Sequence, residues 1–166
     1  IRENVYVAGK SVSIQQIIFG DALAAGATVL VSENISDDAW LLGATVSLLG
    51  AVGGDARIAG SNVLVNSLIV KDLMVAGGTV TISSKTNIGG DLIIAGGIVT
   101  FDGIAAKTAR IIGGEIVING TINGDVSVKA DEKLSFGPDA KIKFNLNYKS
   151  KKEVEIPTGV VTGKVT

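Results

Sequence analysis

The stretch from Gly90 to Phe101 reads GDLIIAGGIVTF, and it contains the pattern that decides the fold. On either side of its central Gly96 the apolar residues alternate with other residues, at Leu92, Ile94, Val99 and Phe101. A period of two predicts short strands with one buried face. A helix is excluded because Gly, which costs about 1 kcal/mol in a helix interior, recurs in every window of this length.

The same pattern returns along the chain with a spacing of 17 residues, apart from one two-residue insertion. Its second position is acidic or Asn in most copies, at Asn4, Asp21, Asp38, Asp55, Asp72, Asp91 and Asp125. Its seventh position is Gly, at Gly9, Gly26, Gly43, Gly60, Gly77, Gly96 and Gly113. One such unit cannot bury its own apolar side, whereas a stack of units can.

The repeat therefore predicts an all-β fold, a three-sided parallel β-helix (solenoid) of about eight coils of 17 residues. We expect the repeat domain to span residues 1–140, and the crossover rule favours a right-handed coil. Residues 141–166 hold six Lys and two Glu, and we expect them to form a basic C-terminal cap and exit segment.

Two columns of the repeat call for a physical reason. The Gly column suits a corner that needs positive φ. The Asp column suits a corner in which each carboxylate accepts a backbone N–H. A Ca²⁺ ladder is the alternative, but one carboxylate per coil supplies few of the 6–8 oxygens that Ca²⁺ takes. We therefore expect no metal.

Composition excludes several classes of function. The chain has no His and no Cys, and its net charge is -1. No imidazole is present for a catalytic triad or a metal site, and no convergent acid–base or nucleophile set is visible. The basic tail has too few bases and rings for a nucleic-acid site. We expect no enzyme activity, no cofactor and no nucleic-acid partner.

Two outward surfaces stand out against the repeat. Ser and Thr recur beside the Val column, as on the ice-binding face of some β-solenoids, although Leu30, Leu64, Ile98 and Glu115 interrupt them. Apolar residues point outward at the end of the first and fourth units, and we group them as the lateral apolar patch: Ile17, Phe19, Leu68 and Val70. Such clusters mark contact surfaces unless the same chain covers them. Trp40 also sits at an outward position and belongs either to a patch or to a covered site.

The units Gly90–Val99 and Gly124–Val128 resemble the bactofilin, or polymer-forming cytoskeletal, family. The segment Ala76–Thr81 is more similar to a branch in which the solenoid is an outer domain fused to membrane segments. The resemblance implies a right-handed, three-sided β-helix that joins end to end into nonpolar filaments. It also implies a place at the membrane or cell wall of the bacterial envelope, with no nucleotide cofactor. Family polymerisation depends on apolar residues of the end coils, here Val5, Val7, Val12, Ile14, Leu134 and Phe136.

Three hypotheses follow. The first is a structural protein that self-assembles through its terminal coils into filaments or an envelope-associated scaffold. The second is an envelope ectodomain that binds a partner or another copy through the lateral apolar patch. The third, less favoured, is an ice-binding Thr/Ser face.

Overall fold

Two parallel sheets and no helix make up the structure, a computed structural model that describes residues 1–166. The larger sheet has nine strands in the order β1 (Val5–Ile14), β2 (Ala22–Val31), β3 (Ala39–Leu48), β4 (Ala56–Val65), β6 (Leu73–Ile82), β8 (Leu92–Phe101), β10 (Ala109–Ile118), β12 (Val126–Phe136) and β14 (Leu146–Ser150). The smaller sheet has the short strands β5 (Leu68–Ile69), β7 (Asn87–Ile88), β9 (Ile104–Ala105), β11 (Thr121–Ile122) and β13 (Lys141–Ile142). The expected all-β class and parallel β-helix are confirmed.

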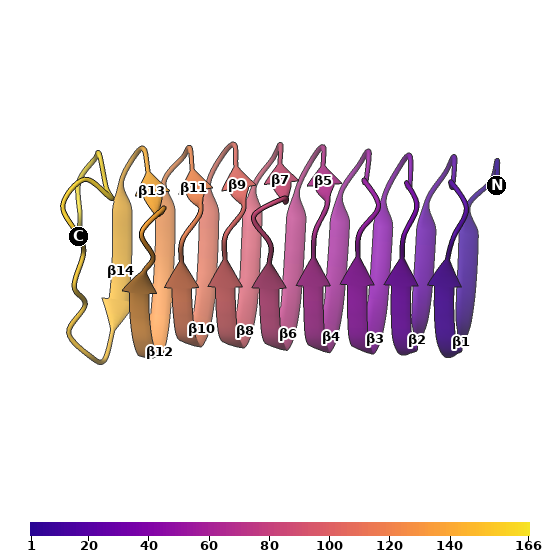
Figure 1. Cartoon of the computed structure of the whole chain (residues 1–166), viewed down its shortest axis with the longest axis horizontal. Helices are drawn as coiled ribbons and strands as arrows, with labels where there is room; N and C mark the ends of the chain where they lie inside the picture. Colours follow the sequence, from indigo (N-terminus) through magenta and orange to yellow (C-terminus); the bar gives the residue numbers. More distant parts are fainter.

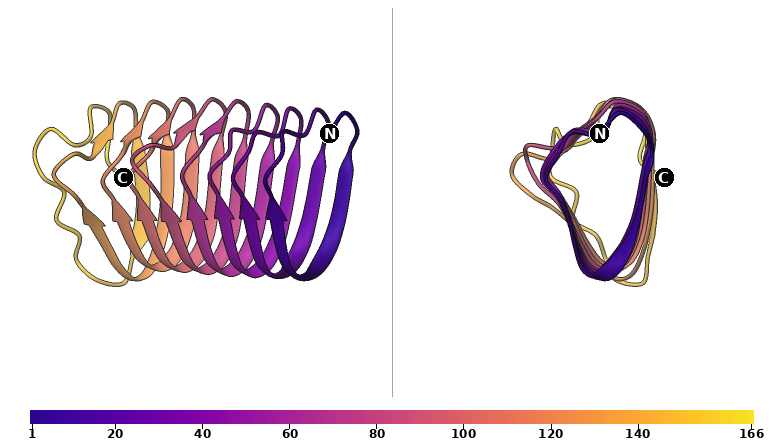
Figure 2. Two further views of the ribbon diagram at one scale, coloured as in Figure 1. Left: turned by 45° about the vertical axis from the view of Figure 1, so that its right-hand side comes forward. Right: turned by 90° about the vertical axis from the view of Figure 1, so that its right-hand side faces the viewer.

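The coils follow one another along a single axis from the N-terminus to the C-terminus (Figure 1). Seen end on, the coil has a rounded triangular outline, and each long strand bends to form two of its sides (Figure 2). In β3 the alternation of buried and exposed residues breaks at Gly43–Thr45, which is the bend. The long sheet has nine strands where the repeat indicates eight units, because β14, which lies beyond residue 140, adds a strand.

Register between neighbouring long strands places like residues over like. Val46 pairs with Val63, Val63 with Val80, and Val80 with Val99. A third inward column runs through isolated bridges from Ile18 to Ile35, Val52 and Ile69, and all four residues are buried. These columns form one core cluster of 39 residues. β-branched and small aliphatic side chains fill it because stacked, pleated strands suit them.

The Gly column is required by space and not by conformation, so the expectation of positive φ was wrong. The one residue with positive φ is Gly159, outside the column. A Cβ at Gly60 would lie 2.5 Å from the carbonyl oxygen of Gly43, and a Cβ at Gly77 would lie 2.6 Å from that of Gly60. Each Gly of the column after Gly9 therefore lets its coil pass close to the coil before it.

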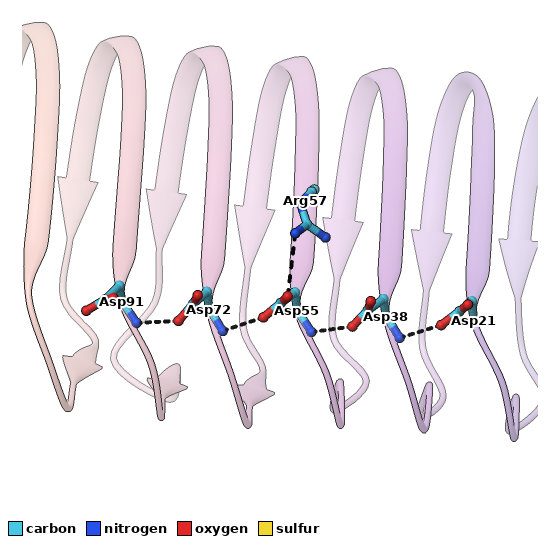
Figure 3. Close-up of polar contacts among 6 residues, drawn as sticks. All are labelled: Asp21, Asp38, Asp55, Arg57, Asp72 and Asp91. Atoms are coloured by element: carbon cyan, nitrogen blue, oxygen red, sulfur yellow. Dashed lines mark hydrogen bonds and ion pairs between the residues drawn. The ribbon is translucent and has the colours of Figure 1, made fainter.

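Hydrogen bonds tie successive coils together at the Asp corner, as predicted. The Oδ1 atom of Asp21 accepts the backbone N–H of Asp38 at 2.9 Å, and Asp38 accepts that of Asp55 at 2.7 Å (Figure 3). The first acceptor of this series is Asn4. The last is Asn145, whose Oδ1 accepts the N–H of Lys164 at 2.9 Å. We call this column the corner ladder: Asn4, Asp21, Asp38, Asp55, Asp72, Asp91, Asp125 and Asn145.

Candidate interaction surfaces

The N-terminal end of the solenoid is open. β1 pairs with β2 on one side, and no strand pairs with its other edge. A hollow at this end is lined by Ile1, Val5, Val7, Val12, Ile14 and Ile18. Val12 and Ile14 are buried at 5% and 6% exposure, whereas Val5 and Val7 are only half-buried. The four apolar residues expected in the first coil therefore surround the mouth of the core.

The opposite end is covered. On its C-terminal side β12 pairs with β14 only from Val126 to Ala130. Leu134 is nevertheless 4% exposed, and Phe136 is half-buried. The tail loops across this end (Figure 1), and its Val154, Ile156 and Val161 pack against the core. The C-terminal tail thus lies over Leu134 and Phe136, and these two residues do not form an exposed apolar surface at this end.

The lateral apolar patch is exposed but divided. Ile17, Phe19, Leu68 and Val70 are 42%, 58%, 50% and 53% exposed. Ile17 and Phe19 flank Ile18, and Leu68 and Val70 flank Ile69. The inward column passes from Ile18 through Ile35 and Val52 to Ile69, so the two pairs of outward residues lie three coils apart. At about 4.8 Å per step this is about 14 Å. The outward residues between them are Asn34, Ser36, Ala51 and Gly53. The four residues form two spots.

The Ser/Thr surface lies on the second half of the long strands. One column runs in register through Ser11, Thr28, Thr45, Asn62, Thr79, Ile98 and Glu115. Ile98 is 49% exposed and Leu64, in the neighbouring column, 38%. The hydroxyl array is therefore broken in the middle coils and ends at Glu115.

A further surface lies on the first half of the same strands, and of its residues only Trp40 stands out in the sequence. Two outward columns run side by side along it. We call the first the ridge, and it contains Tyr6, Leu23, Trp40, Arg57, Met74, Ile93 and Arg110. We call the second the groove, and it contains Ala8, Ala25, Leu42, Ala59, Ala76, Ala95 and Ile112. The ridge and groove together are the apolar face.

One ion pair lies on the apolar face. The guanidinium of Arg57 is 3.5 Å from a carboxylate oxygen of Asp55, and it lies 5.6 Å from the ring centroid of Trp40. Figure 3 shows Arg57 above the corner ladder, which borders the ridge. Pairs this exposed contribute little stability. The contact with the ring nevertheless keeps the Arg57 side chain along the ridge.

Comparison with known proteins identifies no relative: no family model, no curated protein and no solved structure matches this chain. None of its segments forms a helix long and apolar enough to cross a bilayer. The exposed surfaces of the solenoid are therefore the evidence for a function.

Proposed function

We propose that this is a non-enzymatic structural protein that self-associates by stacking its open first coil against another copy. The observation that carries the proposal is the unpaired edge of β1 around the mouth of the core. Unpaired N–H and C=O groups on a strand edge recruit another strand unless they are covered. Stacking would also bury Val5 and Val7, at about 25 cal/mol per Å² of apolar surface removed from water.

Resemblance to the bactofilin family extends the proposal to filaments, or to a scaffold at the bacterial envelope beside membrane or cell wall. A filament needs a second joining surface at the other end of the solenoid. In this chain residues 151–166 lie over that end, and Leu134 is buried there. We infer that growth beyond a pair of copies requires the tail to move aside.

The other two hypotheses have less support. A binding module that uses Ile17, Phe19, Leu68 and Val70 would need one contiguous surface, and these residues form two spots about 14 Å apart. An ice-binding face would need an unbroken hydroxyl array, and Asn62, Ile98 and Glu115 interrupt it.

Gly9 offers a sharp test of end stacking. It lies in β1, whose outer edge is unpaired, and a Cβ there would have its nearest neighbour at 3.8 Å, in Val12. Gly9→Val should therefore fold normally, yet its side chain would collide with any copy stacked closely on β1. We expect sedimentation velocity to show at least a tenfold weaker association than for the wild type, with unchanged thermal stability in dilute solution.

The matched control is Ala27→Val, which enlarges an exposed residue at the equivalent bend of the second coil. It should associate as the wild type does. A wild type that stays monomeric at the highest attainable concentration would refute end stacking, and so would a Gly9→Val variant that associates normally.

A further inference from the structure

We propose that the apolar face is a second self-association surface, through which two copies pack laterally with their solenoid axes parallel. This inference goes beyond end stacking and does not depend on it. The face belongs to the long sheet and not to the open end, so separate substitutions can remove each contact.

The composition of the apolar face sets it apart from its neighbour. Leu42, Met74, Ile93 and Ile112 are 47%, 47%, 40% and 44% exposed. The second half of the same strands instead carries mainly Ser and Thr outward in its first five coils. Strand propensity acts on both halves alike, so it does not explain why one half is apolar. Contiguous exposed apolar surface of this kind marks an interaction site.

Side-chain size on the face is arranged for packing against itself. The ridge carries large residues, whereas five of the seven groove residues are Ala. A two-fold axis parallel to the solenoid axis would lay the ridge of one copy over the groove of the other in every coil. Met74 would then face Ala76, and Ile93 would face Ala95. Facing sheets pack about 10 Å apart in this way, and a two-fold interface uses the same patch on both copies.

Charge is arranged for the same geometry. The two columns continue in register beyond Arg110 and Ile112, with Ser127 and Asn147 following the ridge and Lys129 and Lys149 following the groove. Wherever the columns carry a charge, only one of the two residues in that coil is charged: Arg57 beside Ala59, Arg110 beside Ile112, Lys129 beside Ser127, and Lys149 beside Asn147. Under the axis-parallel two-fold, each charged residue would therefore face a neutral one. Lateral packing places no like charges opposite each other.

The corner ladder decides between this arrangement and others. It borders the ridge side only, with Asp21, Asp38, Asp55, Asp72 and Asp91 in successive coils. A two-fold perpendicular to the solenoid axis would bring two such rows together, whereas the axis-parallel two-fold places them at opposite margins. The same row of carboxylates would repel an anionic bilayer, so a second copy is the favoured occupant.

The area of the face suits a reversible contact. Seven coils from Tyr6 to Ile112 span about 34 Å, and five residues of strand span about 16 Å. The projected area is roughly 500 Å² on each copy, or about 1,000 Å² in total. That total is at the lower bound of biological interfaces. We therefore expect association to be reversible and to depend on protein concentration.

Trp40 is the single Trp of the chain and lies on the ridge, so it reports on the face directly. The experiment uses the Gly9→Val background, which is designed to weaken end stacking at least tenfold. Over rising concentration we expect a blue shift of Trp emission, protection from acrylamide quenching, and a dimer in sedimentation velocity. Leu42→Lys should weaken the dimer at least tenfold. The matched control Ile98→Lys, with 49% exposure against 47% for Leu42, should leave it unchanged.

Cross-linking tests whether the ridge of one copy faces the groove of the other. Introduced Cys residues can be used as specific probes because the chain has no native Cys. Met74→Cys and Ala76→Cys should give dimers with a short bismaleimide when the two variants are mixed, and far fewer when each is alone. The proposal is overturned by a folded protein that stays monomeric in the Gly9→Val background, or by equal losses from Leu42→Lys and Ile98→Lys. It is overturned equally if the Trp40 shift requires phosphatidylglycerol vesicles.

Discussion

The first coil and the interior coils have the same repeat but differ in what covers them. Val7 and Val75 occupy the same position in the pattern, yet Val75 is 1% exposed and Val7 is half-buried. A Cβ at Gly60 would strike the carbonyl oxygen of Gly43 at 2.5 Å, whereas one at Gly9 would meet nothing nearer than 3.8 Å. A position in this repeat therefore takes its energetic weight from the neighbouring coil.

This comparison has a thermodynamic consequence. In stacked repeats, stability is approximately a sum of terms for each repeat and for each interface between neighbours. An interior coil has two such interfaces, and the first coil has one unless another copy stacks on it. Equivalent substitutions in the two places should therefore differ in a predictable way, provided that the protein is dilute enough to be monomeric.

The largest difference is expected for core truncation. Val75→Ala removes two buried methyl groups from a site covered on both sides, and we expect it to lower the free energy of unfolding by about 2–3 kcal/mol. Val7→Ala makes the same chemical change at the open mouth, where the side chain is partly in water, and should cost under about 1 kcal/mol. Urea denaturation of dilute protein measures both. Equal losses would mean that the first coil is covered in solution.

Glycine substitution should give the next largest difference. Gly60→Ala forces the backbone of two coils apart, and overpacking of this kind costs about 1–3 kcal/mol. Gly9→Ala meets no such contact and has no positive φ to preserve. It should be neutral, or stabilising by up to about 1 kcal/mol, because Ala restricts the unfolded chain. Thermal unfolding of both variants at low concentration tests this prediction, and a destabilised Gly9→Ala would contradict the open end.

The regular part of the molecule could be predicted from its sequence because every coil repeats the same local rule. Alternation of apolar residues identified the strands, and the 17-residue spacing of the repeat is also the spacing of Ile18, Ile35, Val52 and Ile69, which form one inward column. The role of the Gly column could not be settled this way. A recurrent Gly is equally consistent with positive φ and with close approach of a neighbouring backbone.

The surfaces were harder to predict than the core. Ile17 and Leu68 were correctly placed outward, but grouping them ignored the two coils between their units. The apolar face was missed because its residues are ordinary within one strand, and they form a surface only when strands stack in register. The cover over Leu134 comes from a tail that does not follow the repeat.

The smallest expected difference concerns the corner ladder. Asp38→Ala removes the Oδ1 that accepts the N–H of Asp55 at 2.7 Å, at a half-buried corner, and should cost about 1 kcal/mol. Asn4→Ala removes the equivalent acceptor at the exposed first coil, where water can replace it, and should cost about half as much.

The charge of the corner ladder can be tested separately. Asp38→Asn keeps an acceptor and relieves repulsion between neighbouring carboxylates. It should be neutral, or stabilising by a few tenths of a kcal/mol at low salt, with the gain lost as salt screens the charges. Urea denaturation at two salt concentrations separates the contributions of hydrogen bonding and charge. If Asp38→Asn costs as much as Asp38→Ala, the negative charge itself stabilises the interior ladder, as a charge-assisted hydrogen bond from the N–H of Asp55 would.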